Sequence, residues 1–474
     1  EGEYEGCRKK NPAKPVLSPD GLGEYAMIKE KTFYKSFMIL ALSLALQNLL
    51  TYGVNMMDTL MLGRYSQNAM GGVSLCNQIQ FLLQMLVVGA GEGAVVMGSQ
   101  YWGRKKLEPI PHIIGVALRF GGALAVLLFI LVFGWPNQIL SLLSNDPAVI
   151  AEGAKYFSII RYTYVIFTIT NILVASLRSI GVVRIGYMIS GSTLVINVCL
   201  NYLLIYGKCG FPEMGAAGAG LATLISRICM PLMMLAYFLR DVSFRRYLLF
   251  FTWAAQGWRR IRQLLSVGLP ISVQMVLEVS AFALSSIMMG WIGAVELAAH
   301  QIVVTFGNFA FMAMVGISSA TTILVSHRFG RGDLDGLTRA ATASCHLALM
   351  TNFLTMCCFI GLRHWIPLLF TSDTAVAAVA AQLFIMAGLY QFSDGLQVVL
   401  LGVLRGMQDV KIVMRYAFVS YIVINLPVGY LCAFTLGMGA PGLWVGFIFG
   451  LGVAALLYWR RYRRLIRRIR AEVG

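Results

Sequence analysis

The chain has 474 residues, of which 58% are hydrophobic and 12% are charged, and its formal net charge is +17. Soluble domains carry about 25% charged residues, so this composition excludes an ordinary soluble protein. Apolar runs of about 20 residues recur along almost the whole chain, which predicts an all-α polytopic membrane protein rather than a barrel of alternating strands.

Twelve membrane spans are expected, in two groups of six. A polar tail over residues 1–34, rich in proline and glycine near its start, is expected to be mobile. The first six spans lie near 36–62, 72–101, 112–134, 154–177, 185–206 and 214–239, within an N-lobe over 35–240. The other six lie near 264–290, 295–326, 340–361, 376–404, 412–435 and 440–459, within a C-lobe over 263–460.

The remaining segments are basic. Residues 241–262 are aromatic and basic, and we expect an amphipathic linker on the membrane surface there. With the N-terminus cytoplasmic, 31 Lys or Arg fall in cytoplasmic segments, and only Arg64, Lys208 and Arg363 fall in external loops. The positive-inside rule therefore predicts that both termini are cytoplasmic. The basic tail over 461–474 is expected to contact anionic membrane lipids, and nucleic acid is not an expected partner.

The two halves of the chain resemble each other. At a shift of 227 residues the aligned pairs are Gly63 with Gly290, Gly89 with Gly316, Ser99 with Ser326, Gly103 with Gly330, and Arg178 with Arg405. Because each copy holds an even number of spans, the repeat predicts two pseudo-symmetric six-helix lobes around a central cavity. Two lobes that rock about a cavity favour a transporter, although a pseudo-dimeric channel would share this symmetry.

Four acidic side chains lie well inside predicted spans: Asp58, Glu92, Glu278 and Asp394. Ionised groups in a membrane are costly, and they often mark ion or proton pathways. The structural alternative is that these carboxylates pair with Arg119, Arg161 or Arg227.

Asp394 shares one helix face with Tyr390 and Gln397, because the three are spaced by about one helical turn. Carboxylate, phenol and amide oxygens suit a small cation, and the carboxylate alone can carry a proton. Glu278 is expected to approach Asp394 in the same lobe, which gives a candidate Na⁺ site on these two residues. Two carboxylates in one apolar site resist joint ionisation, so a bound Na⁺ or H⁺ would relieve the repulsion.

Other polar residues are candidates for lining the central cavity, although hydrogen bonds between helices explain them equally well. These candidates are Asn77, Gln78, Glu92, Asn197, His300, Gln301 and Gln397. The nine cysteines and five histidines show no metal-binding spacing, and catalytic motifs such as GxSxG or HExxH do not occur. The chain is therefore not expected to be an enzyme or to need a cofactor other than the coupling ion.

Several stretches carry a family resemblance: MMDTLMLGR (56–64), VSLCNQI (73–79), SQYWGRKK (99–106), ASLRSIG (175–181), LEVSAFA (277–283), ELAAHQI (296–302) and YQFSDGLQVVLLGVLRGMQD (390–409). In this order they resemble the NorM-type branch of the multidrug and toxic compound extrusion (MATE) transporters. The resemblance implies a monomeric twelve-helix antiporter of the bacterial inner membrane that exports amphipathic, often cationic organic compounds in exchange for Na⁺ or H⁺.

The resemblance also implies roles for single residues. Glu278, Tyr390 and Asp394 match the cation site of the second lobe, and Asp58 matches an acid of the first helix that is proposed to carry a proton. Ser43 stands where many relatives have proline, which puts a proline-dependent bend of the first helix in doubt.

Three other classes compete with an antiporter. A flippase for a lipid-linked sugar would share the two-lobe plan but would need a strongly cationic cavity. A channel would conduct ions well above carrier rates. A membrane enzyme would need a catalytic constellation, and the sequence shows none.

Overall fold

The computed structural model describes residues 30–141, 146–240, 258–371 and 373–473. Within these ranges the chain is helical and contains no strand. Eleven of the described helices are long and apolar enough to cross a membrane, and a bent pair of shorter helices makes a twelfth span. The chain is thus an all-α, multi-pass membrane protein, as the composition predicts.

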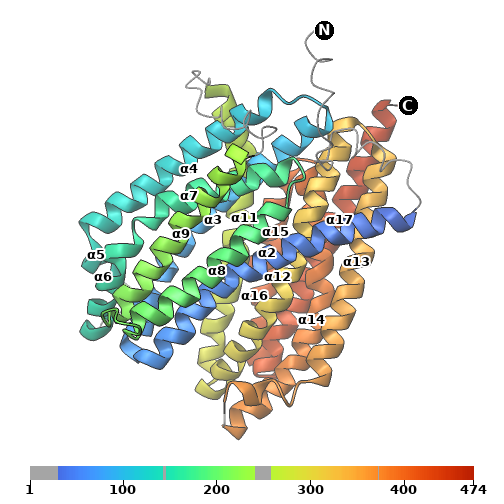
Figure 1. Ribbon diagram of the computed structural model, residues 1–474. Helices are drawn as coiled ribbons and strands as arrows, with labels where there is room; N and C mark the ends of the chain where they lie inside the picture. The colour runs from blue at the N-terminus through green and yellow to red at the C-terminus, as the bar shows by residue number, and fades with distance from the viewer. Residues whose placement is uncertain (1–29, 142–145, 241–257, 372, 474) are drawn as a thin grey trace.

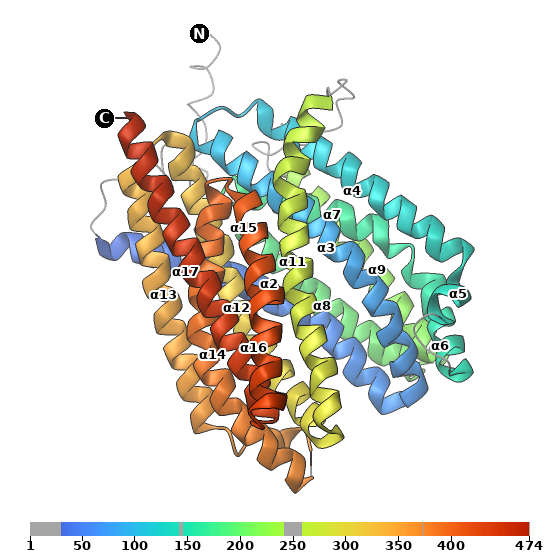
Figure 2. The ribbon, with the colours of Figure 1, turned by 180° about the vertical axis from the view of Figure 1, so that it is seen from behind.

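The two lobes lie side by side, with most of the blue-to-green N-lobe on one side and most of the yellow-to-red C-lobe on the other, while the blue helix at the start of the N-lobe crosses the C-lobe (Figures 1 and 2). The N-lobe contains α2 (Glu30–Tyr65), α3 (Gln67–Gly103), α4 (Pro109–Gly134), α5 (Pro136–Ser141), α6 (Pro147–Ile160), α7 (Thr163–Ser179), α8 (Arg184–Ile205) and α9 (Gly215–Arg240). The C-lobe contains α11 (Trp258–Ile292), α12 (Ala294–Arg331), α13 (Leu334–Gly361), η2 (Pro367–Leu369), α14 (Thr374–Gly406), α15 (Val410–Ala417), η3 (Phe418–Asn425), α16 (Leu426–Tyr430), η4 (Leu431–Thr435) and α17 (Ala440–Val473).

Two predicted spans are irregular helices. The fourth, expected over 154–177, consists of α6 and α7, which are bent by 54° at a short break around Arg161 and Tyr162. The eleventh, expected over 412–435, contains two π-helical segments, η3 and η4, on either side of Pro427. Proline lacks an N–H and cannot keep the regular hydrogen-bond ladder, and π-turns of this kind often occur at functional sites.

At the ends of the lobes, the observed segment boundaries differ from the predicted ones. The basic stretch 461–474 is not separate from the last span, because α17 continues without a break to Val473. Tyr462 and Ile466 on this extension are buried against the C-lobe. Residues 241–257 of the predicted linker 241–262 lie outside the described residues, and residues 258–262 form the start of α11. Residues 1–29 of the predicted tail also lie outside the described residues.

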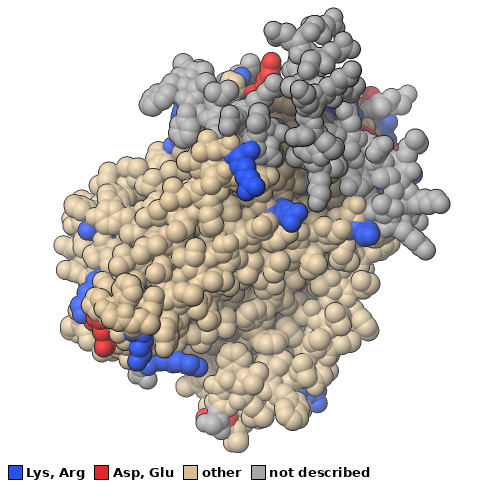
Figure 3. Space-filling model, viewed as in Figure 1, with Lys and Arg blue, Asp and Glu red and all other residues tan. Residues whose placement is uncertain are grey.

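The lobes are held together by shared apolar packing. Phe37 and Leu44 of α2 pack in one buried cluster with Met314 and Ile317 of α12. Figure 1 shows α2 running obliquely from the C-lobe side toward α8. Outside this core, large apolar side chains such as Leu127 are exposed, and on the face seen in Figure 3 charged residues are few. Such a surface suits contact with lipid.

One end of the bundle is named here the basic face, defined by the helix ends Gly103, Arg331 and Gly406. Near it, Ser99 donates to the Ser179 carbonyl at 3.1 Å, and in the other lobe Ser326 donates to the Gly406 carbonyl at 3.2 Å. Both donors and both acceptors are related by the shift of 227. The repeat in the sequence is therefore a repeat in contacts.

Candidate cation site

Asp394 lies in the middle of α14, where its side chain is almost fully buried. Its Oδ1 atom has no hydrogen-bond partner among the described residues. The Tyr390 hydroxyl, one turn earlier, interacts with the carboxylate. Gln397, nearly one turn later, donates through Nε2 to the Tyr421 hydroxyl at 2.6 Å, and its Oε1 has no partner in the described part of the chain. One helix face therefore carries two buried oxygen atoms that lack a donor.

Glu278 lies on α11, and its carboxylate interacts electrostatically with Asp394. Gln274, one turn before Glu278, donates to Glu278 Oε2 at 2.9 Å. The Oε1 atom of Gln274 in turn accepts a hydrogen bond from Arg405 at the end of α14. The two acids thus share a site, but only Glu278 is linked to a cationic side chain, and that link passes through an amide.

Aromatic rings surround Tyr390 and keep the site dry. Its ring meets Trp444 at 5.7 Å and Phe447 at 6.1 Å, both on α17, and Phe282 of α11 at 6.4 Å, all edge to face. An apolar wall of this kind strengthens every charge interaction inside it and makes an unbalanced charge costly.

The structural alternative, in which arginine neutralises these acids, does not hold for Asp394 and Glu278. Neither carboxylate forms an ion pair within 4.0 Å in the described ranges. Of the three arginines considered, Arg161 instead stacks over Phe133 at 4.5 Å, and Arg119 is exposed on α4. No arginine in the described ranges therefore pairs directly with Asp394 or Glu278.

Asp58 lies in the other lobe, buried in α2. It accepts hydrogen bonds from Asn201 and, at 3.0 Å, from Thr223. Asn197, a predicted cavity residue, belongs to the same buried cluster, since it accepts from Asn201 at 3.1 Å. Arg227 interacts electrostatically with Asp58 without forming an ion pair. Both carboxylate oxygens of Asp58 thus accept a hydrogen bond, unlike those of Asp394 in the described part of the chain.

The other predicted positions divide into two groups. Glu92 on α3 is buried and forms an ion pair with Arg178 at 3.1 Å, a partner that the sequence reasoning had not considered. His300 is also buried and shares a hydrogen bond with Ser286 of α11 at 3.1 Å, a contact between two helices. Gln78 and Gln301 are exposed, and Asn77 is partly buried.

Sequence reasoning missed several neighbours of the site. Gln274, Arg405, Tyr421 and Trp444 all contact it, and none was a candidate. Two signals were available. Gln274 precedes Glu278 by four residues and so shares its helix face, and Arg405 is the repeat partner of Arg178. Nothing in the sequence indicated that Tyr421 contacts the site, because a π-helical segment sets the direction of its side chain.

Comparison with known proteins agrees with this architecture. The MatE family profile matches the chain twice, over residues 43–203 and 270–431, and the two segments start at repeat-related positions. "Probable multidrug resistance protein NorM" of Rhizobium meliloti is 31% identical over 456 residues, covering 93% of this chain and 95% of its own. "Multidrug resistance protein MdtK" of Pectobacterium atrosepticum is 31% identical over 434 residues, covering 89% and 93%.

Solved structures share the fold at low sequence identity. A structure described as the outward-facing conformation of a multidrug resistance MATE family transporter superposes with a TM-score of 0.85 at 17% identity, covering 92% of this chain and 97% of that one. A transporter of the MOP superfamily from Pyrococcus furiosus gives 0.82 at 18% identity, with 92% and 96% covered. With the profile matching most of both lobes, the chain belongs to the MatE family.

Proposed function

We propose that this protein is a secondary active multidrug efflux transporter that exports amphipathic, cationic organic compounds in exchange for Na⁺ or H⁺. The observation that carries the proposal is the buried Asp394 carboxylate, which lies beside Glu278 and has one oxygen without a partner among the described residues. The relatives named as multidrug resistance proteins support the substrate class. An acid kept uncompensated in the membrane is expected where a mobile cation binds.

Charge balance suggests one cation for each cycle. In the described part of the C-lobe, Asp394 and Glu278 carry two negative charges against one partly buried cationic side chain nearby, Arg405, so one monovalent cation would neutralise the site. Its ligands would be the oxygens of Asp394, Glu278, Tyr390 and Gln397. This set favours Na⁺ over H⁺, because a hard cation binds several oxygens at once whereas a proton satisfies one or two. In the N-lobe, Asp58 has Arg227 nearby, and we assign it at most a separate proton.

The proposed orientation follows from the distribution of charge. We place the basic face and both termini in the cytoplasm of a bacterium, with the protein in the inner membrane. The lobes are bonded to each other at the basic face, for example by Gln100 donating to the Gly406 carbonyl at 3.0 Å. The described conformation is then closed to the cytoplasm, and the exposed Gln78 and Gln301 lie on the external part of the substrate path.

Efflux from proteoliposomes tests this function. Purified protein with a fluorescent cationic dye inside the vesicles is given an inward Na⁺ gradient or an inward pH gradient. We expect Asp394→Asn and Glu278→Gln to insert normally but to lose gradient-driven efflux. Glu152→Gln is the matched control, because it removes a surface carboxylate paired with Lys155 at 2.6 Å. Efflux by both site variants at the parental rate would refute the proposed site.

A further inference from the structure

Two arginines related by the repeat meet one acid between the lobes. Arg178 lies in the last turn of α7 and Arg405 in the last turn of α14, at equivalent positions. Glu92 of α3 is ion-paired with Arg178 at 3.1 Å and also interacts electrostatically with Arg405 of the opposite lobe. The residue equivalent to Glu92 in the C-lobe is Ser319, which carries no charge. One carboxylate therefore interacts with two partly buried guanidinium groups, by an ion pair with Arg178 and at longer range with Arg405.

The second arginine is also linked to the cation site. Arg405 donates to Gln274, and Gln274 donates to Glu278 at 2.9 Å. Its Nε atom has no hydrogen-bond partner in the described structure, and the same holds for the Nε atom of Arg178. Arg405 is thus attracted electrostatically by two carboxylates, that of Glu92 in the N-lobe and that of Glu278 at the cation site.

The residues that follow these arginines close the basic face. The Ser179 carbonyl, directly after Arg178, shares a 3.0 Å hydrogen bond with His327 Nε2 of the C-lobe. The Gly406 carbonyl, directly after Arg405, accepts from Gln100 of the N-lobe, also at 3.0 Å. These two inter-lobe bonds are equivalent under the repeat.

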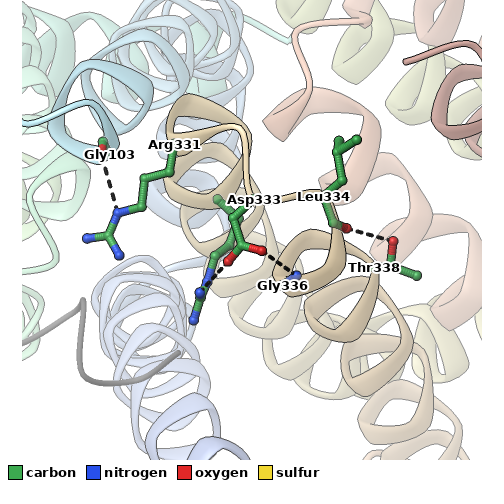
Figure 4. A network of polar contacts seen from close by, with 7 residues as sticks. Gly103, Arg331, Asp333, Leu334, Gly336 and Thr338 are labelled. Carbon is green, nitrogen blue, oxygen red and sulfur yellow. Dashed lines mark hydrogen bonds and ion pairs between the residues drawn. The ribbon is translucent and has the colours of Figure 1, made fainter. Parts of the chain in front are cut away.

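A second equivalent pair lies beside them. Arg331 donates to the Gly103 carbonyl at 3.2 Å (Figure 4), and Arg104 donates to the Gly330 carbonyl at 3.3 Å. Together the four bonds, named here the closure contacts, join the lobes where the two arginine-bearing helices end. Two of the closure contacts thus involve the residues directly after Arg178 and Arg405.

We propose that Glu92 is a positioning residue that couples the cation site to closure of the basic face. With the site empty, Glu92 and Glu278 together balance Arg178 and Arg405, and the lobes stay closed. A cation between Asp394 and Glu278 offsets part of the negative charge that Glu278 presents to Arg405, so the two guanidinium groups then depend more on Glu92. Their repulsion across the lobe boundary favours opening of the basic face. This inference rests on the proposed function, because it assumes a cation at that site.

The test measures the distance between the lobes. Lys106→Cys and Lys411→Cys, exposed positions of the two lobes at the basic face, are spin-labelled in a background without the native cysteines. Distance distributions are recorded by electron paramagnetic resonance in lipid nanodiscs, with Na⁺ or K⁺ at equal ionic strength, and at two pH values. The readout is the ratio of open to closed conformers, which a loss of general packing would not change in a charge-specific way.

We expect Glu92→Gln to raise the open-to-closed ratio by about tenfold, within the usual range of coupling between sites. Arg405→Gln in the Glu92→Gln background is expected to restore closure, because it removes one of the two repelling charges. Ser319→Glu supplies the missing second acid and is expected to increase closure and to weaken the response to Na⁺. Glu152→Gln is again the control and is expected to leave the ratio unchanged.

The outcomes separate the two proposals. If the parent protein opens with Na⁺ and the Glu92→Gln variant has the parental distance distribution, the role of Glu92 is overturned. In another outcome, the parent protein does not respond to Na⁺ or pH, but Glu92→Gln still opens the basic face and Arg405→Gln still restores closure. That result would reject the cation site and keep the electrostatic role of Glu92 in closure. Opening of Glu92→Gln without rescue by Arg405→Gln would also overturn the proposal.

Discussion

A methyl group at Gly103 should open the basic face by steric contact alone. Gly103 of α3 lies against the C-lobe, and a Cβ atom built there would be 2.3 Å from the His327 carbonyl oxygen. That oxygen belongs to the backbone and cannot rotate away. Because a carbon–oxygen contact normally spans about 3.3 Å, Gly103→Ala must separate α3 from α12 by about 1 Å.

The size of the effect follows from this overlap. Overpacking by one methyl group typically costs about 1–3 kcal/mol, and the cost arises only while the lobes are in contact. The open conformer does not carry it, so the open-to-closed ratio should rise roughly 5- to 150-fold. Gly330 is the repeat partner of Gly103, and its Cβ would be 2.3 Å from the Gln100 carbonyl oxygen. Gly330→Ala should therefore have a similar effect.

Inter-lobe distance distributions between spin labels at 106 and 411 provide the assay. Gly122→Ala is the matched control, because a Cβ at Gly122 of α4 meets nothing within 4 Å. We expect it to leave the ratio unchanged. Because Glu92 is intact in the glycine variants, they should raise the ratio by the same factor with and without Na⁺. Gly103→Ala and Gly330→Ala with the parental distance distribution would refute the idea that these crossings hold the lobes closed.

Three further predictions concern single residues. Asp58→Asn should abolish efflux driven by a pH gradient while Na⁺-driven efflux persists, and unchanged pH-driven efflux in vesicles would reject a proton at Asp58. Tyr421→Phe removes the acceptor of the 2.6 Å bond from Gln397, so the Na⁺ concentration for half-maximal efflux should rise about fivefold, as expected for one hydrogen bond of ~1 kcal/mol. An unchanged value would show that Gln397 does not bind the cation. Asp333 caps α13 by accepting from the Gly336 N–H at 2.8 Å (Figure 4). It also pairs with Arg328, so Asp333→Ala should lower the free energy of unfolding by about 1 kcal/mol in thermal unfolding. Partial burial raises the pKa of Asp333, but the Gly336 N–H and Arg328 outweigh it and hold the pKa below its usual value. The stabilisation is therefore present above the ordinary pKa and lost as the pH falls through the lowered one, and a difference between variant and parent that persists in strong acid would contradict this.

Much of the architecture follows from the sequence alone. In lipid each backbone polar group must be satisfied within its own segment, so apolar runs of sufficient length become helices. The predicted spans therefore match the observed helices closely, from α2 to α17. The repeat of 227 residues likewise predicts two lobes, because equivalent residues such as Ser99 and Ser326 make equivalent contacts. The face shared by Tyr390, Asp394 and Gln397 also follows from helical spacing.

The tertiary structure decided which charges meet. Glu92 pairs with Arg178, and Gln274 joins Glu278 to Arg405, although these partners lie far apart in the sequence or carry no charge. Tyr421 reaches Gln397 because a π-helical segment sets its direction. Helical period and hydropathy specify the face on which a residue lies, but they do not specify the rotation and crossing of one helix against another. Those are set by packing between helices, and they determine which buried acid keeps a free oxygen.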